Sequence, residues 1–254
     1  NKLLELGGEQ QMISLGERNE GYLAKVGEPL IQFYGYKTCG VWNSAEEIAA
    51  NPHFSDDAPG GIRIVDTNND GSLTPEDRVA LGTPYPDFTW GITNTFQIKD
   101  FDISFLIQGV QGITVLNGDV YYNETKKWNK KYTKNRWVSA EHPGDGKTHY
   151  QNVKTGHDLM LTDYPLQNAS YACLRNFTVG YTLPATAARK IKLSGVRFYV
   201  SGSNLLYIWG SGYKGINPES RMTSGNYSSA MISGYQRGGF PLTSTISAGF
   251  DINF

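Results

Sequence analysis

The C-terminal stretch Leu242-Thr-Ser-Thr-Ile-Ser-Ala-Gly-Phe-Asp-Ile-Asn-Phe254 alternates apolar and polar side chains up to its last residue. Successive side chains on a β-strand point to opposite faces of a sheet. The stretch therefore predicts one strand with an apolar face and a polar face. The apolar phase holds Leu242, Ile246, Ala248, Phe250, Ile252 and Phe254, and the polar phase holds Thr243, Thr245, Ser247, Asp251 and Asn253.

Two kinds of protein contain such strands. In an outer-membrane barrel the side chains that face lipid are apolar and those that face the lumen are polar. In a soluble antiparallel sheet the same alternation arises when one face is buried in a core. The C-terminal strand by itself does not separate these alternatives, and the rest of the chain has to decide between them.

Four further segments repeat the alternation, so five strands are predicted in all. They are Asp87–Ile98, in which Asn94 is the one polar residue on the apolar face, Phe101–Gly109, Asn176–Leu183 and Val196–Gly202. The links Lys99-Asp100 and Pro184–Gly195 are short, whereas the segments 7–86, 112–169 and 210–241 are long. Short periplasmic turns that alternate with long extracellular loops are expected of an outer-membrane barrel. Counted from a periplasmic C-terminus, all three long segments lie outside the cell.

Composition limits the remaining possibilities. The chain has 254 residues and a formal net charge of −1, which argues against nucleic acid as a partner. It has no apolar run long enough for a transmembrane helix, and no signal peptide, since it opens on Asn1–Leu6 as if inside a structured region.

Five strands cannot close a wide barrel, and an open sheet edge cannot face lipid, so the missing strands should lie upstream or on another polypeptide. Cys39 and Cys173 are expected to be unpaired thiols rather than a disulfide.

The sharpest local motif is a 12-residue acidic loop at 66–77. Its oxygen-bearing residues and its glycine at the sixth position follow the spacing of EF-hand and dockerin loops, which hold calcium through oxygen ligands. The expected ligands are Asp66, Asn68, Asp70, Ser72 through its carbonyl, Thr74 through a water, and Asp77. The loop thus predicts a structural Ca²⁺ site, with Mg²⁺ as the second choice. A surface turn rich in Asp and Asn is the alternative interpretation.

In its ordered motifs the chain resembles the SusC/RagA-type TonB-dependent transporters of Bacteroidetes. The resemblance spans nearly the whole chain and corresponds to the C-terminal part of such a protein. The motifs that carry it are Val26–Tyr36, Gly40-Val-Trp42, Pro59-Gly-Gly-Ile62, Asp66–Gly71, Leu81–Pro86, Phe88–Gly91, Gln108–Gly112, Arg136-Trp137, Leu174–Pro184, Val196–Leu205, Asn217-Pro-Glu219 and Phe254.

The resemblance implies an all-β fold and a role in import. Residues 1–254 would form the C-terminal segment of an antiparallel transmembrane barrel of roughly 22 strands with a plugged lumen. Such a protein would take up oligosaccharides or peptides across the bacterial outer membrane, together with a SusD-like surface lipoprotein that forms a lid. The plug and the segment that contacts TonB belong to the N-terminal part of the family and are not in this sequence.

Two other functions compete with import. A secreted, calcium-stabilised all-β module that binds glycans would have its apolar strand faces packed against each other. An enzyme is not expected, because the acidic pairs and histidines lack the spacing of a catalytic or metal site. For contact with cargo or lid the candidates are aromatic residues of the long loops, which can instead pack the loops together: Trp42, Tyr121, Tyr122, Trp128, Tyr213 and Tyr235.

Overall fold

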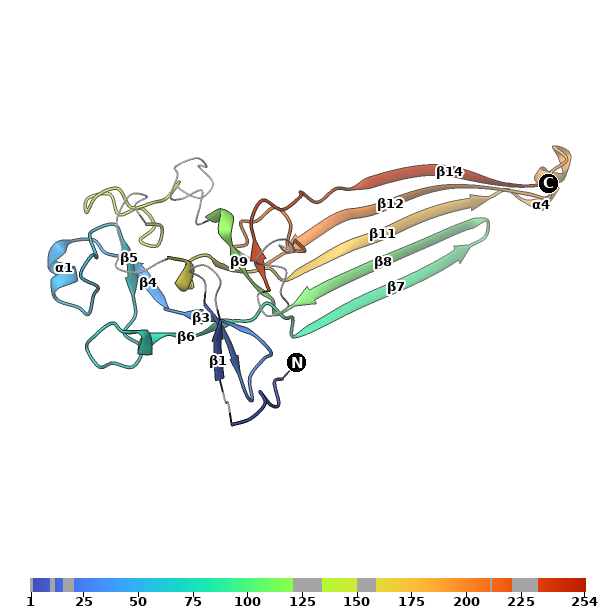
Figure 1. Ribbon diagram of the computed structural model, residues 1–254. Coiled ribbons are helices and arrows are strands. Elements are labelled where there is room, and N and C mark those ends of the chain that lie inside the picture. Colours follow the sequence, from blue (N-terminus) through green and yellow to red (C-terminus); the bar gives the residue numbers. More distant parts are fainter. Residues whose placement is uncertain are drawn as a thin grey trace.

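The computed structural model shows a long five-stranded sheet that projects from a lobe of smaller sheets and loops (Figure 1). It describes residues 2–9, 12–15, 21–120, 134–149, 159–210, 212–220 and 233–254. The chain is almost entirely β-structure and loops, as predicted from its alternating segments. Its helices are short: α1 spans Ala45–Ala49 and α4 spans Ala185–Lys190.

Among the residues described, no helix has both the length and the apolar character needed to cross a membrane.

The long sheet contains the five predicted strands, and every neighbouring pair in it is antiparallel. Their order across the sheet is β14-β12-β11-β8-β7. The strands are β7 (Phe88–Ile98), β8 (Phe101–Gln111), β11 (Tyr171–Thr182), β12 (Gly195–Trp209) and β14 (Thr245–Asn253).

Two of these strands are longer than the alternation predicts, because a β-bulge interrupts it. The register of β11 shifts between Leu174 and Asn176 against both of its neighbours. The extra residue places Leu174 on the same face as Phe177, although the two are three positions apart. A strand predicted from uninterrupted alternation therefore starts only at Asn176, whereas β11 begins five residues earlier, at Tyr171. Its partner β12 continues correspondingly, beyond the predicted end at Gly202, to Trp209.

Both short connections lie at the end of the sheet that also holds the C-terminus (Figure 1). Lys99 and Asp100 form the tight turn between β7 and β8, and Lys99 adopts a positive φ of 55°. The second connection contains α4 and the left-handed Lys192. The short links thus lie at one end of the sheet and the long segments at the other, as the predicted alternation requires.

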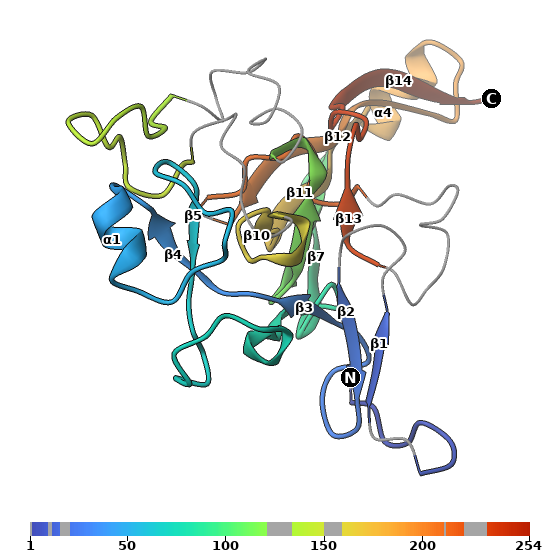
Figure 2. The ribbon, with the colours of Figure 1, turned by 60° about the vertical axis from the view of Figure 1, so that its left-hand side comes forward.

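The lobe is built from the three long segments together and surrounds the other end of the sheet (Figure 2). Residues far apart in sequence pair there, because β9 (Thr114–Asn117) lies between β10 (Leu166–Asn168) and β13 (Tyr235–Gln236). Tyr36 also bridges to Thr162. The remaining elements are β1 (Met12–Leu15), β2 (Tyr22–Lys25), β3 (Gln32–Gly35), β4 (Thr38–Val41), β5 (Ile62–Ile64), the single-turn helix η1 (Pro75–Asp77), β6 (Val79–Gly82) and the single-turn helix η2 (Leu159–Leu161).

The hydrophobic core lies in the lobe rather than beside the long sheet. One cluster gathers around Tyr22, Phe33 and Leu116, and a second around Tyr36 and Ile62. By contrast, every residue of β7 is exposed. Away from the lobe the long sheet is therefore a single layer, and no second layer in the described chain covers its apolar face.

Candidate functional site

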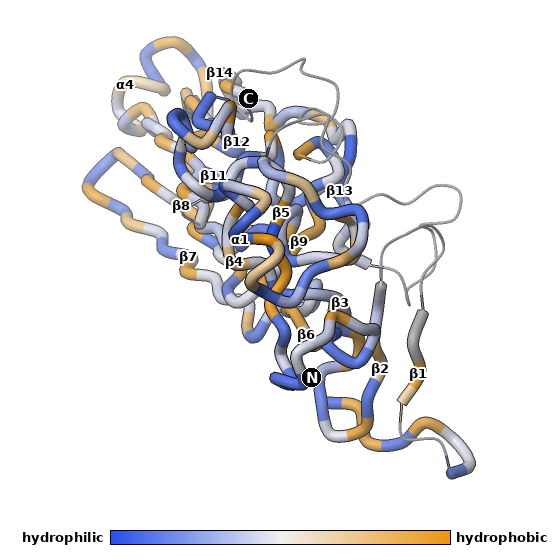
Figure 3. Tube along the Cα trace, turned by 90° about the vertical axis from the view of Figure 1, so that its left-hand side faces the viewer, coloured by the Kyte–Doolittle hydropathy of each residue, from blue (hydrophilic) through white to orange (hydrophobic). Residues whose placement is uncertain are grey.

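One face of the long sheet is apolar and uncovered. The registers place alternate residues of the five strands on it, and Figure 3 shows the alternation along β7 and β8. Ile246 is 75% exposed and Ile208 65%. A soluble protein does not leave such a surface in water, because contiguous apolar patches are covered by a partner or a membrane. The large exposed side chains of this face are Phe88, Trp90, Ile92, Phe96, Ile98, Phe101, Phe198, Val200, Leu206, Ile208, Ile246, Phe250 and Ile252.

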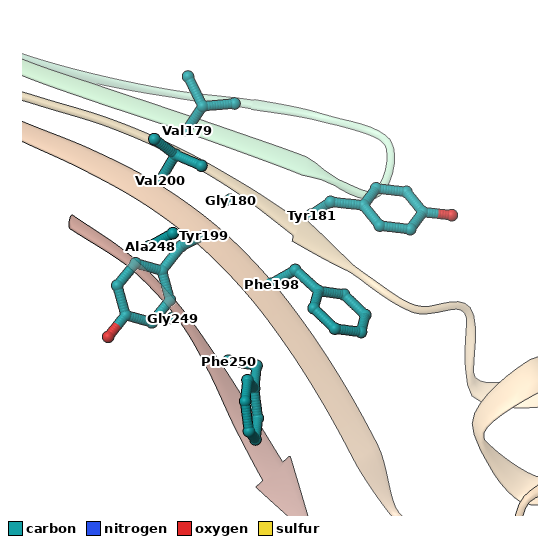
Figure 4. Close-up of a pocket in the computed structure, with 9 residues that line it drawn as sticks. All are labelled: Val179, Gly180, Tyr181, Phe198, Tyr199, Val200, Ala248, Gly249 and Phe250. Carbon is teal, nitrogen blue, oxygen red and sulfur yellow. The ribbon is translucent and has the colours of Figure 1, made fainter. Parts of the chain in front are cut away.

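Aromatic side chains form a row across this face near the short turns. Phe101 pairs with Tyr181, Tyr181 with Phe198, and Phe198 with Phe250. Figure 4 shows three of these rings on neighbouring strands, beside a shallow apolar groove of the same face. The ring centroids of Phe101 and Tyr181 are 4.8 Å apart. Barrels of the outer membrane have such aromatic girdles where lipid meets water.

The length of the strands fits the thickness of a membrane. The 11 residues of β7 span about 34 Å at a rise of about 3.4 Å per residue. A strand tilt of about 40° reduces this span to about 26 Å along the membrane normal. The apolar band of outer-membrane barrels is about 25 Å tall. The apolar face therefore has the dimensions of a surface that crosses the hydrocarbon layer once per strand.

The opposite face of the sheet carries an ion-pair network. Arg197 donates to both carboxylate oxygens of Asp102, over 3.0 and 2.6 Å, and to Asp251 over 3.4 Å. The pair crosses β11 above Gly180, where an added Cβ would lie 2.3 Å from Asp102 Oδ1. The three charged side chains thus join β8, β12 and β14 on the face that a barrel turns toward its lumen.

A second network on this face attaches a loop to the sheet, and no motif of the sequence predicts it. Arg175, at the bulge of β11, forms a salt bridge with Glu219 of the segment 210–241. It also donates to Asn204 over 2.7 Å and to the hydroxyl of Tyr207 over 2.8 Å. Because Glu219 is distant in sequence, only the three-dimensional arrangement reveals that this loop folds back against the strands.

The acidic loop at 66–77 is closed by hydrogen bonds from backbone amides to its own side chains. Asp66 accepts from Asn69 over 2.7 Å and from Gly71 over 2.9 Å. Asp70 accepts from Ser72 over 2.8 Å, and Gly71 turns the chain at φ 86°. These contacts gather the first half of the motif into one turn, as its spacing predicts.

Asp77 closes the loop from within. It is fully buried and accepts from the amides of Thr67 and Thr74, each over 2.8 Å. Burial opposes ionisation, but the amides of Thr74, Thr67 and Asn68 outweigh it and hold the pKa of this carboxyl below its usual value. The carboxylate therefore serves the loop as a hydrogen-bond acceptor.

The oxygen atoms of the loop are suitable ligands for a hard cation, but its acidic side chains alone do not form a metal site. Its side chains offer only oxygen ligands at the expected positions. Within the described residues, however, no three side chains of His, Cys, Asp or Glu are close enough together to hold a metal. A cation here would therefore have to use Asn68, Ser72 and Thr74 beside Asp66 and Asp70.

The structure corrects three of the aromatic candidates for cargo or lid contact. Trp42 is fully buried and its indole N–H donates to Asp57 over 3.3 Å. Tyr213 is 7% exposed and donates to Gln236 over 2.8 Å, and Tyr235 is 2% exposed. These side chains pack the lobe and have no surface left for cargo. Three other candidates, Tyr121, Tyr122 and Trp128, lie outside the described residues.

The two cysteines are free, as expected. Cys39 is exposed in the lobe, and Cys173 is buried in β11. A disulfide between the wall and the lobe is thereby excluded.

Together, the single-layer sheet with one apolar face, its aromatic row and its polar opposite face define the wall of a membrane-spanning antiparallel barrel. No protein-family model matches the chain. TonB-dependent receptor P26 of Formosa agariphila is 30% identical over 269 residues, which cover 100% of this chain and 26% of the relative. TonB-dependent receptor SusC of Bacteroides thetaiotaomicron is 27% identical over 157 residues, which cover 61% of this chain and 15% of the relative.

Solved structures agree with this fold. The RagAB peptide importer in its closed-closed state aligns with a TM-score of 0.69 at 18% identity, over 100% of this chain and 26% of that one. Another RagAB structure aligns with a TM-score of 0.71 over 99% of this chain and 25% of that one. The chain is a segment of a SusC/RagA-like TonB-dependent transporter, and such receptors are β-barrels of the outer membrane. It spans about a quarter of the length of the P26 relative.

These findings do not favour the secreted glycan-binding module. That alternative requires the apolar strand faces to pack against each other, whereas the described sheet is a single layer. The relatives above are named as receptors and the solved neighbours as an importer, and none of them as an enzyme.

Proposed function

We propose that this chain forms part of the wall and the outer loops of a nutrient importer that takes up oligosaccharides or peptides. The observation that carries the proposal is the uncovered apolar face, 11 residues tall in β7, behind which lies a polar, charged face. Only a lipid-embedded barrel leaves both faces in favourable surroundings. The similarity to TonB-dependent receptors over the whole chain supports energised import as the activity of the complete protein.

The proposed orientation puts the lobe outside the cell and the C-terminus in the periplasm. Both short connections and the C-terminus share one end of the sheet, and the lobe takes the other (Figure 1). Periplasmic turns of such barrels are short and extracellular loops long. The segments 7–86, 112–169 and 210–241 are accordingly extracellular in this proposal.

The proposed partners follow from the surfaces that the chain leaves uncovered. The outer edges of β7 and β14 would pair with the remaining barrel strands. The face that carries Arg197 and Asp251 would meet the plug, since Asp251 keeps a side chain that is 59% exposed. A SusD-like lipoprotein would cover the lobe as a lid, and TonB would act through an N-terminal segment. The cargo would pass between lid and lobe.

The test is purification of the complete protein from membranes, followed by intact-mass measurement and by uptake of labelled oligosaccharides and oligopeptides. We expect a polypeptide several times longer than 254 residues, or a second chain with the missing strands, together with a co-purifying lipoprotein. Deleting the transporter should abolish uptake of its cargo. A 28.1 kDa species that is monodisperse without detergent would contradict the proposal and favour the glycan-binding module.

We also propose that the loop at 66–77 binds Ca²⁺ as a structural ion. Its support is the set of oxygen ligands at the expected spacing and the turn around Gly71 that gathers them. The ion would fix the position of a long extracellular segment. Mg²⁺ is the competing ion, and it would require a smaller octahedral site.

The calcium site can be tested by calorimetric titration of Ca²⁺ and Mg²⁺ into the complete protein after treatment with EDTA. Asp70→Asn removes a charged ligand and keeps an oxygen to accept from Ser72, so the turn should survive. We expect Ca²⁺ affinity to fall about tenfold or more in Asp70→Asn. Asp56→Asn, an exposed carboxylate outside the loop, is the matched control. Identical titrations of wild type and Asp70→Asn would contradict the site.

A further inference from the structure

The lobe contains a polar cleft with a volume of about 650 Å³ that no sequence motif marks. Its walls come from five parts of the chain that fold together only in the lobe. They are Thr38–Gly40 of β4, Val120, the turn Asp145–Thr148, the pair Asp163-Tyr164, and Lys214. Neither the acidic loop nor the buried aromatic residues described above contribute to the cleft.

Asp163 is the charged group of the cleft for which only one carboxylate oxygen accepts hydrogen bonds from the described chain. Its Oδ1 accepts from the amide of Thr38 over 3.0 Å and from the hydroxyl of Thr38 over 2.6 Å. No hydrogen bond reaches its Oδ2 from the part of the chain that is described. Burial raises the pKa of this carboxyl, although the contacts from Thr38 act against the increase. A cation placed at Oδ2 would therefore gain more here than at a solvated surface carboxylate.

The second carboxylate of the cleft is already neutralised by its surroundings. Asp145 accepts from the amides of Lys147 and Thr148 over 2.9 and 2.7 Å, and from the hydroxyl of Thr148 over 3.0 Å. Lys214 lies near enough to help lower the pKa of Asp145, although burial of the carboxyl opposes this. Lys147 and Lys214 balance the two carboxylates of the cleft in formal charge, and Lys37 also acts on Asp163. Asp163 is therefore distinguished by the geometry at its Oδ2 rather than by an excess of charge.

We propose that this cleft binds a primary ammonium group of the cargo at Asp163 Oδ2, beside the ring of Tyr164. An ammonium group supplies positive charge and three N–H donors, whereas a sugar hydroxyl supplies one donor without charge. The inference rests on the proposed import function and narrows its cargo to molecules that carry an amine, of which a peptide amino terminus and an amino sugar are the two sources.

Cys39 provides a direct readout, because its exposed thiol lines the same cleft. The complete transporter is treated with a maleimide, and modification of the peptide that contains Cys39 is followed by mass spectrometry. The probes are trialanine, N-acetyl-trialanine and the trimer of glucosamine. We expect a free amine to protect Cys39. Protection by trialanine identifies a peptide source, and protection only by the glucosamine trimer identifies a sugar source. Protection by N-acetyl-trialanine that equals protection by trialanine, or the absence of protection by all three probes, would overturn the proposal.

A substitution tests the carboxylate itself. Asp163→Asn removes the charge but keeps an oxygen for Thr38, so the lobe should remain folded, and an unchanged rate of Cys39 modification without probe verifies this. We expect binding of the protecting amine, measured by calorimetry, to weaken about tenfold or more. Asp56→Asn should leave it unchanged. Equal affinity in wild type and Asp163→Asn would overturn the ammonium site. If uptake of labelled cargo by the wild-type transporter nevertheless proceeds, the proposed import function stands without it.

Discussion

Two adjacent residues of β7 offer the sharpest test of the membrane face, because the sheet directs them to opposite sides. Ile92 lies on the apolar face with 55% of its surface exposed, and Thr93 lies on the polar face. An arginine near the bilayer midplane on the lipid face of a barrel costs about 2–4 kcal/mol. We expect Ile92→Arg to lower the free energy of unfolding by this amount, and Thr93→Arg to change it by less than about 0.5 kcal/mol.

The register of β7 sets the expected size of the effect. Ile92 lies six residues from Ile98, which pairs with Phe101 in the aromatic row. Six residues correspond to about 20 Å along the strand and, at a tilt of about 40°, to about 16 Å of depth. In a band about 26 Å tall this position is only about 3 Å from the midplane. Ile98→Arg, at the interface, should cost about 0–1 kcal/mol and completes a depth series.

The assay is equilibrium unfolding of the complete protein in lipid vesicles by guanidinium chloride, followed by tryptophan fluorescence. Each variant should first show the wild-type uptake of cargo or the wild-type mobility on unheated gels, which verifies that it inserts. The reasoning would be refuted if Thr93→Arg were as costly as Ile92→Arg. It would also be refuted if the cost at Ile98 equalled that at Ile92, since the expected effect depends on depth.

Two further variants test the packing of the wall and of the lobe. Gly180→Ala would force Asp102 and Arg197 apart, because the new Cβ would lie 2.3 and 2.5 Å from their side-chain atoms. We expect a loss of up to about 1 kcal/mol in the same unfolding assay, the scale of an exposed ion pair, while Gly91→Ala, whose Cβ would meet only contacts of 3.8 and 3.9 Å, should stay near wild type. Asp77→Asn should destabilise the lobe by about 2–3 kcal/mol near neutral pH, measured as faster proteolysis of the loops. The pKa of Asp77 is lower in the folded protein, so its contribution is complete above the unfolded value of about 4 and is lost as the pH falls through the folded value. This pH dependence would be contradicted if the ratio of the proteolysis rates of variant and wild type were the same at all pH values.

The positions of the strands and the two faces of the sheet could be predicted from local sequence. A period of two is a local property of an extended chain, so the alternation that ends at Phe254 assigns each side chain to a face without knowledge of its neighbours. The turn at Lys99-Asp100 could be located for the same reason. The oxygen-rich turn around Gly71 also follows from local chemistry, because each of its contacts joins residues at most five apart.

The tertiary structure decided what the long loops do. The sequence marks Trp42, Tyr213 and Tyr235 as aromatic residues of loops, but burial depends on which distant segments fold over them, and no local period records that. The same holds for the bulge at Arg175, where a partner from the 210–241 segment stabilises a break in the alternation. The pairing of Asp102 with Arg197 and the cleft around Asp163 arise in the same way. These features depend on contacts between residues many positions apart, which are fixed by packing rather than by local conformational preference.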